Sequence, residues 1–264
     1  MDGAFDRGEL ARLEAADRAN QYLYQVMDIG QAMLQSGGEV SRVEDSIRRQ
    51  CMAYGAQRAD VFSITSNIEV TMYGPGFGAI TQTRRVIGQQ TDLYRLELLN
   101  QLSRRICQER LTAEEMAAAL KEIQATPQYP FPVQVFTYAL VSASFCVFFG
   151  GTAADAAVSG LIGVVLKFLD RAIRRVQPNA FLSALLCSCL GGLLASAAVR
   201  YGLGQNLDMI NIGNIMLLIP GLALTNSLRD MFSGDTLSGL MRFLEAILLA
   251  LTLALGFALV TAAV

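Results

Sequence analysis

The sequence contains no histidine among its 264 residues. This absence removes histidine-based acid–base chemistry, Ser-His-Asp triads and most zinc sites in one step. The five cysteines include no Cys-x-x-Cys pair, so we expect no disulfide framework. The glycine-rich segment at 74–78 lacks the Lys-Ser/Thr that a nucleotide-binding loop requires. The chain is therefore predicted to hold no metal and no other cofactor.

Charged residues are scarce in the second half of the chain. Of the 44 charged side chains, 31 lie in residues 1–130 and only 13 lie in residues 131–264. A shift this sharp usually separates an aqueous domain from a lipid-embedded one. The formal net charge is −2 and no basic stripe is present, so we expect no nucleic-acid partner. The sequence thus predicts a soluble domain at 1–130 and a transmembrane domain at 131–264.

The first half has the patterns of a mixed domain of helices and strands. Apolar residues recur every three or four positions in several segments, which indicates helices. Elsewhere Ile68, Val70 and Met72 alternate with polar neighbours, as in a half-buried strand. The predicted helices cover about 5–34, 39–54, 91–109 and 113–123, and the predicted strands cover 61–64, 68–73 and 79–87. We expect an α+β domain with a small antiparallel sheet, followed by a proline-rich linker near 127–132.

The second half contains about five apolar stretches, each a candidate transmembrane helix. They are 133–150, 154–169, 180–199, 210–224 and 240–263. The second and fourth need flanking residues to reach the length of about 20 that a span requires. The alternative is a large buried helical core, but five such stretches leave too little polar surface for a soluble protein. The fold class is therefore predicted as a membrane α-helical protein of about five transmembrane helices with an N-terminal α+β domain.

Basic residues between the stretches predict the orientation in the membrane. The link between the second and third stretches carries Lys167, Arg171, Arg174 and Arg175, whereas the preceding link carries no basic residue. Basic links stay on the cytoplasmic side. We therefore expect a cytoplasmic N-terminal domain and a C-terminus on the outer side.

Several polar residues lie inside the apolar stretches. Asp155, Asn211, Asn214 and Glu245 are expensive to place in lipid and commonly face a water-filled path. Pro220-Gly221 is expected to break the fourth helix and free backbone groups for a substrate or a neighbouring helix.

Each of these residues also has a structural alternative. Glu245 could pair with Arg242 one turn earlier, and the two asparagines could hydrogen-bond between helices. Asp155 lies close to a helix start, where the helix dipole would stabilise its carboxylate.

A charged cluster follows Ser36-Gly37-Gly38 in the first half. Ser36 and Glu39 have the spacing of a capping box at a helix start. Glu39, Arg42, Glu44 and Asp45 could form surface ion pairs at helical spacing, a regulatory or gating contact, or a hydrolytic site. Since no nucleophile–base pair accompanies the cluster, the first two interpretations are favoured over catalysis.

Two segments resemble one protein family. Residues 34–45 read Leu-Gln-Ser-Gly-Gly-Glu-Val-Ser-Arg-Val-Glu-Asp, and residues 219–235 read Ile-Pro-Gly-Leu-Ala-Leu-Thr-Asn-Ser-Leu-Arg-Asp-Met-Phe-Ser-Gly-Asp, continuing to Gly239 and Glu245-Ala246. We call them the first motif (34–45) and the second motif (219–246). Their order, spacing and domain layout are similar to those of the threonine/serine exporter (ThrE) family across essentially the whole chain.

The resemblance implies a subunit of a secondary exporter in the bacterial inner membrane, not an enzyme, with the N-terminus cytoplasmic and the C-terminus periplasmic. Fused members of the family carry about ten spans, so this chain resembles the larger subunit of the split, YjjP-type arrangement. It implies a small YjjB-type membrane partner, lipid contact and a small carboxylate substrate, either a dicarboxylate such as succinate or threonine and serine. The number of copies in the assembly stays open.

The resemblance also suggests roles for individual residues. A carboxylate that crosses lipid needs a cation or a set of N–H donors. The expected substrate-binding residues are Asn211, Asn214, Pro220, Gly221, Thr225, Asn226 and Arg229. The candidates for proton or ion coupling are Asp155, Glu245, Asp230 and Asp235, of which the last two could instead pair with Arg229 or cap the following helix.

Two other functions remain open from the sequence. One is a membrane-anchored enzyme or sensor with its active site in the N-terminal domain. The other is a scaffold subunit whose partner holds the whole transport path.

Overall fold

The computed structural model describes residues 7–88, 90–127, 129–176 and 179–263. The chain forms two compact units. The first unit contains residues 1–127 and 225–243, and the second contains 128–224 and 244–264. Segment 225–243, which lies inside the predicted transmembrane domain, thus packs with the N-terminal half.

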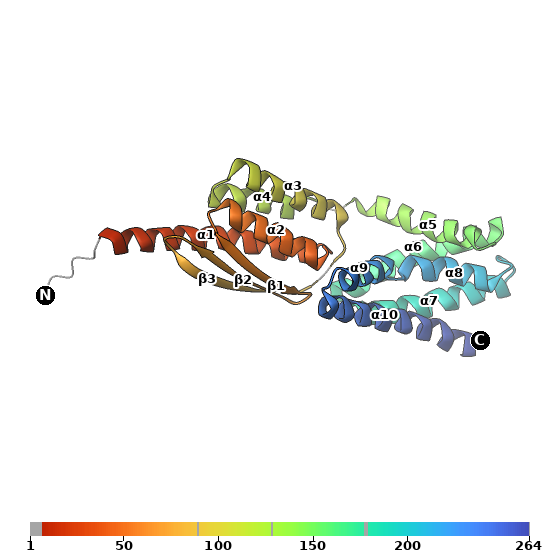
Figure 1. The fold of residues 1–264 in the computed structure, drawn as a ribbon. Helices are drawn as coiled ribbons and strands as arrows, with labels where there is room; N and C mark the ends of the chain where they lie inside the picture. Colours follow the sequence, from red (N-terminus) through yellow and green to blue (C-terminus); the bar gives the residue numbers. More distant parts are fainter. Residues whose placement is uncertain (1–6, 89, 128, 177–178, 264) are drawn as a thin grey trace. The chain divides into compact units, whose positions relative to one another are not determined.

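The first unit is built from four helices and a three-stranded antiparallel sheet (Figure 1). The helices are α1 (Arg7–Gln35), α2 (Val40–Ala53), α3 (Leu93–Glu109) and α4 (Ala113–Ala125). The strands are β1 (Arg58–Ile64), β2 (Asn67–Gly74) and β3 (Gly78–Arg85), with β2 in the centre. The predicted small antiparallel sheet is therefore confirmed. Phe5, where the first helix was expected to begin, lies outside the described residues.

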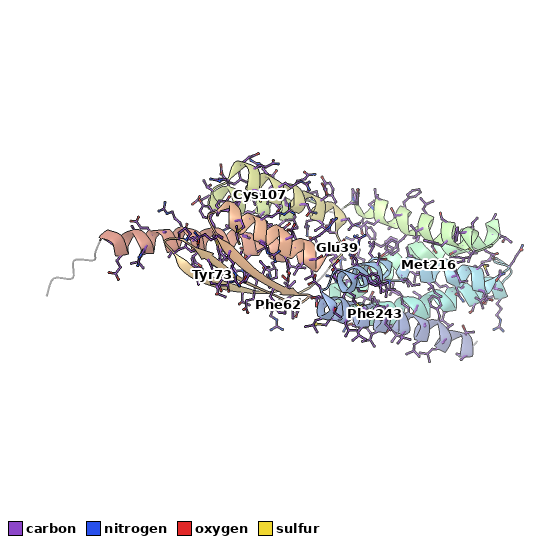
Figure 2. All side chains as sticks on the ribbon, in the orientation of Figure 1. Glu39, Phe62, Tyr73, Cys107, Met216 and Phe243 are labelled. Carbon is purple, nitrogen blue, oxygen red and sulfur yellow. The ribbon has the colours of Figure 1, made fainter. Side chains whose placement is uncertain are left out.

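Side-chain alternation explains the position of the sheet. Ile68, Val70 and Met72 of β2 are fully buried, whereas their neighbours on the other face are not. Val61 of β1 lies opposite Val70, and Ile80 of β3 lies opposite Met72. The buried face packs against α1 and α2. Phe62 and Tyr73, both labelled in Figure 2, have exposed side chains.

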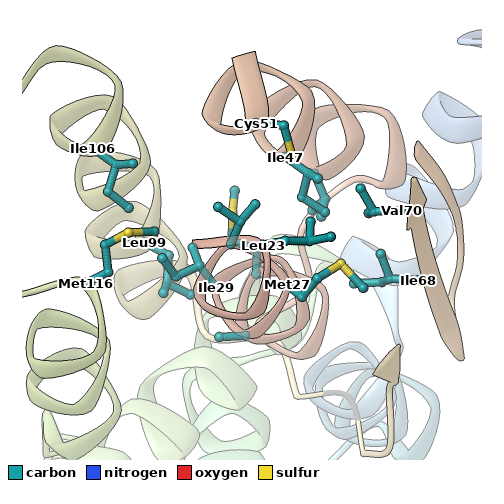
Figure 3. Packing of buried hydrophobic residues seen from close by; sticks show 14 of the residues in the cluster. Leu23, Met27, Ile29, Ile47, Cys51, Ile68, Val70, Leu99, Ile106 and Met116 are labelled. Carbon is teal, nitrogen blue, oxygen red and sulfur yellow. The ribbon is translucent and has the colours of Figure 1, made fainter. Parts of the chain in front are cut away.

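The hydrophobic core of the first unit surrounds α1 (Figure 3). Figure 3 shows residues of α2 and the sheet on one side of α1 and residues of α3 and α4 on the other. The residues labelled there are Leu23, Met27, Ile29, Ile47, Cys51, Ile68, Val70, Leu99, Ile106 and Met116. Burying a side chain of this size stabilises a fold by about 1.5–3 kcal/mol. The first unit therefore has a large core of its own.

A capping box fixes the start of α4. The Thr112 hydroxyl accepts from the Glu115 N–H at 3.3 Å, and the Glu115 carboxylate accepts from the Thr112 N–H at 2.8 Å. Two N–H groups that lack helical partners are thereby satisfied.

The second unit is helical and contains α5 (Phe131–Phe148), α6 (Ala153–Val176), α7 (Ala180–Arg200) and α8 (Leu207–Leu218). α9 (Gly221–Phe232) and α10 (Thr236–Ala263) each contribute residues to both units. Helix α5 packs on α6 and α8, and α7 also contacts both. Small residues allow these contacts: a Cβ on Gly163 of α6 would lie 2.8 Å from the Tyr138 carbonyl oxygen of α5.

Three helices are long and apolar enough to cross a membrane, namely α5, α7 and α10. α8 and α9 pass the same test together as one span bent by 55°, which raises the number to four. α6 does not pass the test, although it corresponds to the second predicted stretch. Its 24 residues include six charged ones: Asp155, Lys167, Asp170, Arg171, Arg174 and Arg175. The described helices thus include three or four candidate spans, against about five expected from the sequence.

Candidate functional site

The turn between α1 and α2 depends on the two glycines of the first motif. Gly37 has a φ of +90°, in the left-handed region that favours glycine. The Gly38 N–H donates to the Met33 carbonyl oxygen at 2.9 Å. A Cβ on Gly38 would lie 2.9 Å from the same oxygen, so no larger residue fits without a shift. This turn places the start of α2 directly after the end of α1.

The start of α2 is capped by a residue of the second motif. Glu39 occupies the N-cap position, but its side chain makes no capping hydrogen bond, so the expected capping box with Ser36 is wrong. The Val40 N–H instead donates to Oδ1 of Asp230 at 3.2 Å. The first N–H groups of a helix favour a carboxylate because they carry partial positive charge. Asp230 therefore caps a helix that starts 190 residues before it.

Arg242 balances the buried charge of Asp230. Its Nη1 lies 3.2 Å from Oδ2 of Asp230, and its Nη2 donates to the Gly38 carbonyl oxygen at 3.3 Å. The two side chains are 6% and 0% exposed, so water does not screen the pair. Asp230 was expected to pair with Arg229 or to cap the following helix. Both alternatives are wrong, because its carboxylate is shared between Arg242 and the start of α2.

A second ion pair lies nearer the surface. Arg229 pairs with Glu39, which lies at the start of α2 in Figure 2. Arg42 approaches the other oxygen of Glu39 at 3.5 Å. The side chains of Arg229 and Arg42 are 56% and 71% exposed. The Asn226 amide donates to the Gly37 carbonyl oxygen at 3.3 Å. Residues of both motifs therefore meet through several independent polar contacts.

We call this arrangement the motif contact. It consists of Gly37, Gly38, Glu39, Val40, Asn226, Arg229, Asp230 and Arg242. All eight residues belong to the first unit.

Glu44 extends the contact to the sheet. Its Oε1 accepts from the Ser63 N–H at 2.6 Å, and the Ser238 hydroxyl donates to the Ser63 carbonyl oxygen at 3.1 Å. Burial raises the pKa of Glu44, although the Ser63 hydrogen bond opposes the shift. Asp235 adds a repulsive charge, and burial also raises the pKa of Asp235. The end of β1 is thus held by one residue from each motif region.

The chemistry of the motif contact is that of a reversible link. Its charged groups pair with each other, and no nucleophile–base pair is present among its residues. Within the described parts of the chain, no group of three or more acidic or cysteine side chains could hold a metal ion. Such pairs can open and close when a neighbouring charge or helix moves. The Glu39–Arg42 and Asp45–Arg49 pairs match the surface ion pairing expected at helical spacing, and nothing in the geometry supports catalysis.

Asn214 lies in a buried polar cluster of the second unit. The Ser142 hydroxyl of α5 lies 2.8 Å from the Ser159 hydroxyl of α6 and donates to Oδ1 of Asn214 at 2.8 Å. The Asn214 amide donates to the Ile210 carbonyl oxygen at 2.9 Å. All three side chains are fully buried. This geometry matches the interhelical hydrogen bonding that was the alternative to substrate binding.

Asn211 and Pro220-Gly221 lie along the same interrupted segment. Oδ1 of Asn211 is buried and has no hydrogen-bond partner among the described residues. α8 ends at Leu218 and α9 begins at Gly221, so the break predicted at Pro220 is present. Proline has no N–H to donate, and the Gly221 N–H turns back to the Ile219 carbonyl oxygen. The helical hydrogen-bonding pattern is therefore interrupted between Leu218 and Gly221.

Asp155 is fully buried at the start of α6. Its Oδ2 accepts from the N–H and the hydroxyl of Thr152 at 2.9 and 2.8 Å. Its Oδ1 accepts from the N–H groups of Gln205 and Asn206 at 2.6 and 3.0 Å. The carboxylate therefore fastens the loop before α8 to the start of α6, as expected for a helix-start residue.

Glu245 has an exposed side chain in α10. Its expected alternative partner, Arg242, is engaged with Asp230 instead, and Glu245 forms no ion pair within the described residues. An exposed carboxylate on a candidate span must meet water, a lipid headgroup or another protein.

Sequence reasoning missed several residues that the structure brings together. Arg242 was considered only as a partner of Glu245, and Ser63, Ser142, Ser159 and Ser238 were not singled out. An arginine near the start of an apolar helix is a signal that could have identified Arg242, since a buried cation requires a partner. Single serines carry no comparable signal.

These features together define a multi-pass membrane protein in which two separated motifs bind each other. Residues 25–264 match the ThrE family, described as "Putative threonine/serine exporter". The chain belongs to the threonine/serine exporter family, and the family predicted from the two motifs is confirmed. Since members of this family are transporters, the prediction that the chain is not an enzyme is confirmed as well.

Three relatives cover most of this chain. The "Probable threonine/serine exporter" of Mycobacterium tuberculosis is 24% identical and the match covers 86% of this chain and 43% of the relative. The "Threonine/serine exporter" of Corynebacterium glutamicum is 27% identical, with 83% of this chain and 46% of the relative covered. The "Probable succinate transporter subunit YjjP" of Klebsiella aerogenes is 23% identical, with 85% of this chain and 86% of the relative covered. The chain thus spans less than half the length of these two exporters. No solved structure matches it.

Proposed function

We propose that this chain is one subunit of an inner-membrane exporter of small carboxylates, acting with a second, smaller membrane subunit. The observation that carries the proposal is the family match over residues 25–264, which includes both motifs. One relative, of which the chain covers 86%, is named as a transporter subunit, and this name supports a two-subunit form. The proposed partner is of the YjjB type.

The proposed orientation places the N-terminal half in the cytoplasm and the C-terminus in the periplasm. Basic residues near the end of α6 support this orientation. Lys167 lies 4.5 Å from the centre of the Tyr138 ring, and Arg171 lies 4.0 Å from the centre of the Phe131 ring. Cations beside aromatic rings are typical of the membrane–water boundary.

We also propose that α6 is a fifth membrane segment despite its charges. Asp170 is buried and accepts from Arg174 and from the Ser183 hydroxyl of α7, both at 2.7 Å. A carboxylate satisfied in this way can lie close to the boundary of the membrane.

The motif contact is proposed as the gate of the transport path. Arg229 is half exposed and pairs with Glu39, so the carboxylate of a substrate could compete for the same guanidinium. Thr225 and Asn226 lie in the same helix as Arg229 and supply further polar groups. Asp230 and Asp235 are candidates for coupling, because protonation of Asp230 would weaken its links to α2 and Arg242, and protonation of Asp235 would remove a charge that repels Glu44.

Efflux from cells tests this proposal directly. Cells would express this chain with and without a small second membrane subunit, and export of succinate, threonine and serine would be measured. We expect efflux of one of these substrates only when both proteins are present. Export that depends on neither protein would contradict the proposal. It would also be contradicted if none of the three substrates were exported although both proteins were confirmed in the membrane.

Variants of this chain separate a transport role from a scaffold role. If Arg229→Gln and Asn226→Ala leave efflux unchanged while deletion of the chain abolishes it, the chain is a scaffold and the partner holds the path. Loss of efflux with normal membrane levels of both variants would support the gate.

A further inference from the structure

A groove between α1 and α4 of the first unit lies apart from the motif contact. It has a volume of about 410 Å³ and is lined by Tyr24, Gln25, Asp28, Gln31, Gln35, Ala117, Leu120, Lys121 and Gln124. A smaller cavity of about 190 Å³ shares Gln35 and Gln124 with it and adds Arg95 and Asp92 at the start of α3. The two cavities therefore adjoin. Small-molecule sites commonly have volumes of about 300–1,000 Å³, so the groove is large enough for a metabolite.

One side of the groove carries a fixed carboxylate. Oδ1 of Asp28 on α1 accepts from Nε of Arg84 at 3.0 Å. The Arg84 guanidinium is itself held 4.4 Å from the centre of the Tyr24 ring. This arrangement fixes Asp28 while its second oxygen makes no hydrogen bond within the described residues. Asp28 can therefore accept from an ammonium or hydroxyl group in the groove.

The α4 side of the groove carries one cation, Lys121, and the adjoining smaller cavity carries another, Arg95. Lys121 of α4 is exposed and forms no ion pair or hydrogen bond with any residue that the structure describes. Arg95 lines the adjoining smaller cavity, where it pairs with Asp92 at 3.8 Å and donates from Nη2 to the Gln124 carbonyl oxygen at 3.4 Å, while its buried Nε makes no hydrogen bond. A buried donor without an acceptor is rare and calls for a partner. Lys121 and Arg95 can therefore both receive a carboxylate.

Side-chain amides also line the groove. Gln31 and Gln35 donate their amide hydrogens to the carbonyl oxygens of Arg85 and Ile87, at 2.9 and 3.1 Å. These bonds leave the amide oxygens of Gln31 and Gln35 as acceptors. The apolar residues Ala117 and Leu120 complete the lining. The lining is thus mostly polar, as suits a charged ligand rather than an apolar one.

We propose that this groove binds a small zwitterion, a molecule that carries an amine and a carboxylate as an amino acid does. The amine would bind Asp28, and the carboxylate would bind Lys121 and Arg95. A simple dicarboxylate lacks a group for Asp28 and would be repelled by it. The site lies wholly within the first unit, so it would sense the ligand rather than carry it across the membrane.

Equilibrium dialysis of the purified full-length chain in detergent tests the site, with radiolabelled serine and succinate as probes. We expect saturable serine binding, and succinate binding weaker by about tenfold or more. Lys121→Gln should weaken serine binding by about tenfold or more. Its exposed neighbour Glu122→Gln, which does not line the groove, should leave binding unchanged.

Three results would overturn the proposal. The first is no saturable serine binding by the unmodified chain. The second is serine binding by the Lys121→Gln variant equal to that of the unmodified chain. The third is succinate binding as tight as serine binding, which would make the groove a general anion site.

Discussion

Asp230 and Arg242 form a buried ion pair whose two partners depend on each other. Removing Arg242 would leave the Asp230 carboxylate uncompensated next to α2. Breaking a buried pair in this way costs about 3–5 kcal/mol, whereas an exposed pair contributes about 0–1 kcal/mol. We therefore expect Arg242→Met to lower the thermal unfolding temperature of the full-length chain in detergent far more than Arg229→Met does.

The double variant provides the control for this prediction. Arg242→Met combined with Asp230→Leu removes both charges, so most of the lost stability should return. Equal effects of Arg242→Met and Arg229→Met would show that the buried pair contributes no more than the exposed one.

Glu44 predicts a pH dependence of stability. Burial raises its pKa in the folded state above the ordinary value of 4.5, so the folded state binds the proton more tightly than the unfolded state does. The free energy of unfolding should therefore fall as pH rises from about 4.5 through the raised pKa. In Glu44→Gln this contribution disappears, and the unfolding temperature should fall less over that range.

Asp45→Asn is the matched control, since Asp45 is an exposed neighbour in the same helix. It should keep the pH dependence of the unmodified chain. A dependence that is identical in Glu44→Gln and the unmodified chain would exclude Glu44 as its source.

At the scale of elements, the turn between α1 and α2 determines whether the motifs can meet. A Cβ on Gly38 would lie 2.9 Å from the Met33 carbonyl oxygen, and the backbone would have to shift. We expect Gly38→Ala to destabilise the first unit by more than about 1 kcal/mol and to weaken the motif contact. The unfolding temperature and protease resistance of the full-length chain measure the effect.

Gly221→Ala is the comparison for the turn. A Cβ on Gly221 meets no atom within 4 Å, and its φ is not in the left-handed region. Alanine should therefore be tolerated there or stabilise α9 by about 0.5–1 kcal/mol. If both substitutions had the same effect, the close approach at Gly38 would not matter for stability.

The elements differ in how well the sequence predicts them. Alternation at Ile68, Val70 and Met72 predicts β2, and Thr112 with Glu115 predicts the capping box of α4, because both patterns are local. The start of α2 shows the limit. Ser36 and Glu39 have the spacing of a capping box, but Asp230 takes that role from 190 residues away. A contact so distant in the sequence leaves no local pattern.

The same limit applies to the candidate site. The charged cluster singles out Glu39, and the resemblance of the second motif singles out Arg229 and Asp230, but neither gives their pairing. The pairing of Arg242 with Asp230 rather than Glu245 depends on how α9 and α10 turn around Gly234, whose φ is +98°. Helical spacing alone favours Glu245, which lies only three residues from Arg242.

At the scale of the whole molecule, the second motif (219–246) contributes residues to both units. Segment 225–243 packs with the N-terminal half, while 244–263 packs with the helices of the second unit. Helix α10 (Thr236–Ala263) therefore contributes residues to both units.

Charge reversal across the motif contact tests the central claim, that the pairing of the two motifs controls export. Efflux would be measured for Glu39→Arg, for Arg229→Glu and for the two combined, with the partner present and membrane levels matched. Each single variant places like charges together, so we expect a loss of about tenfold or more in efflux rate. The combined variant restores an opposite pair and should recover much of the rate. If the single variants export normally, or the combined variant is no better than either, the contact does not control transport.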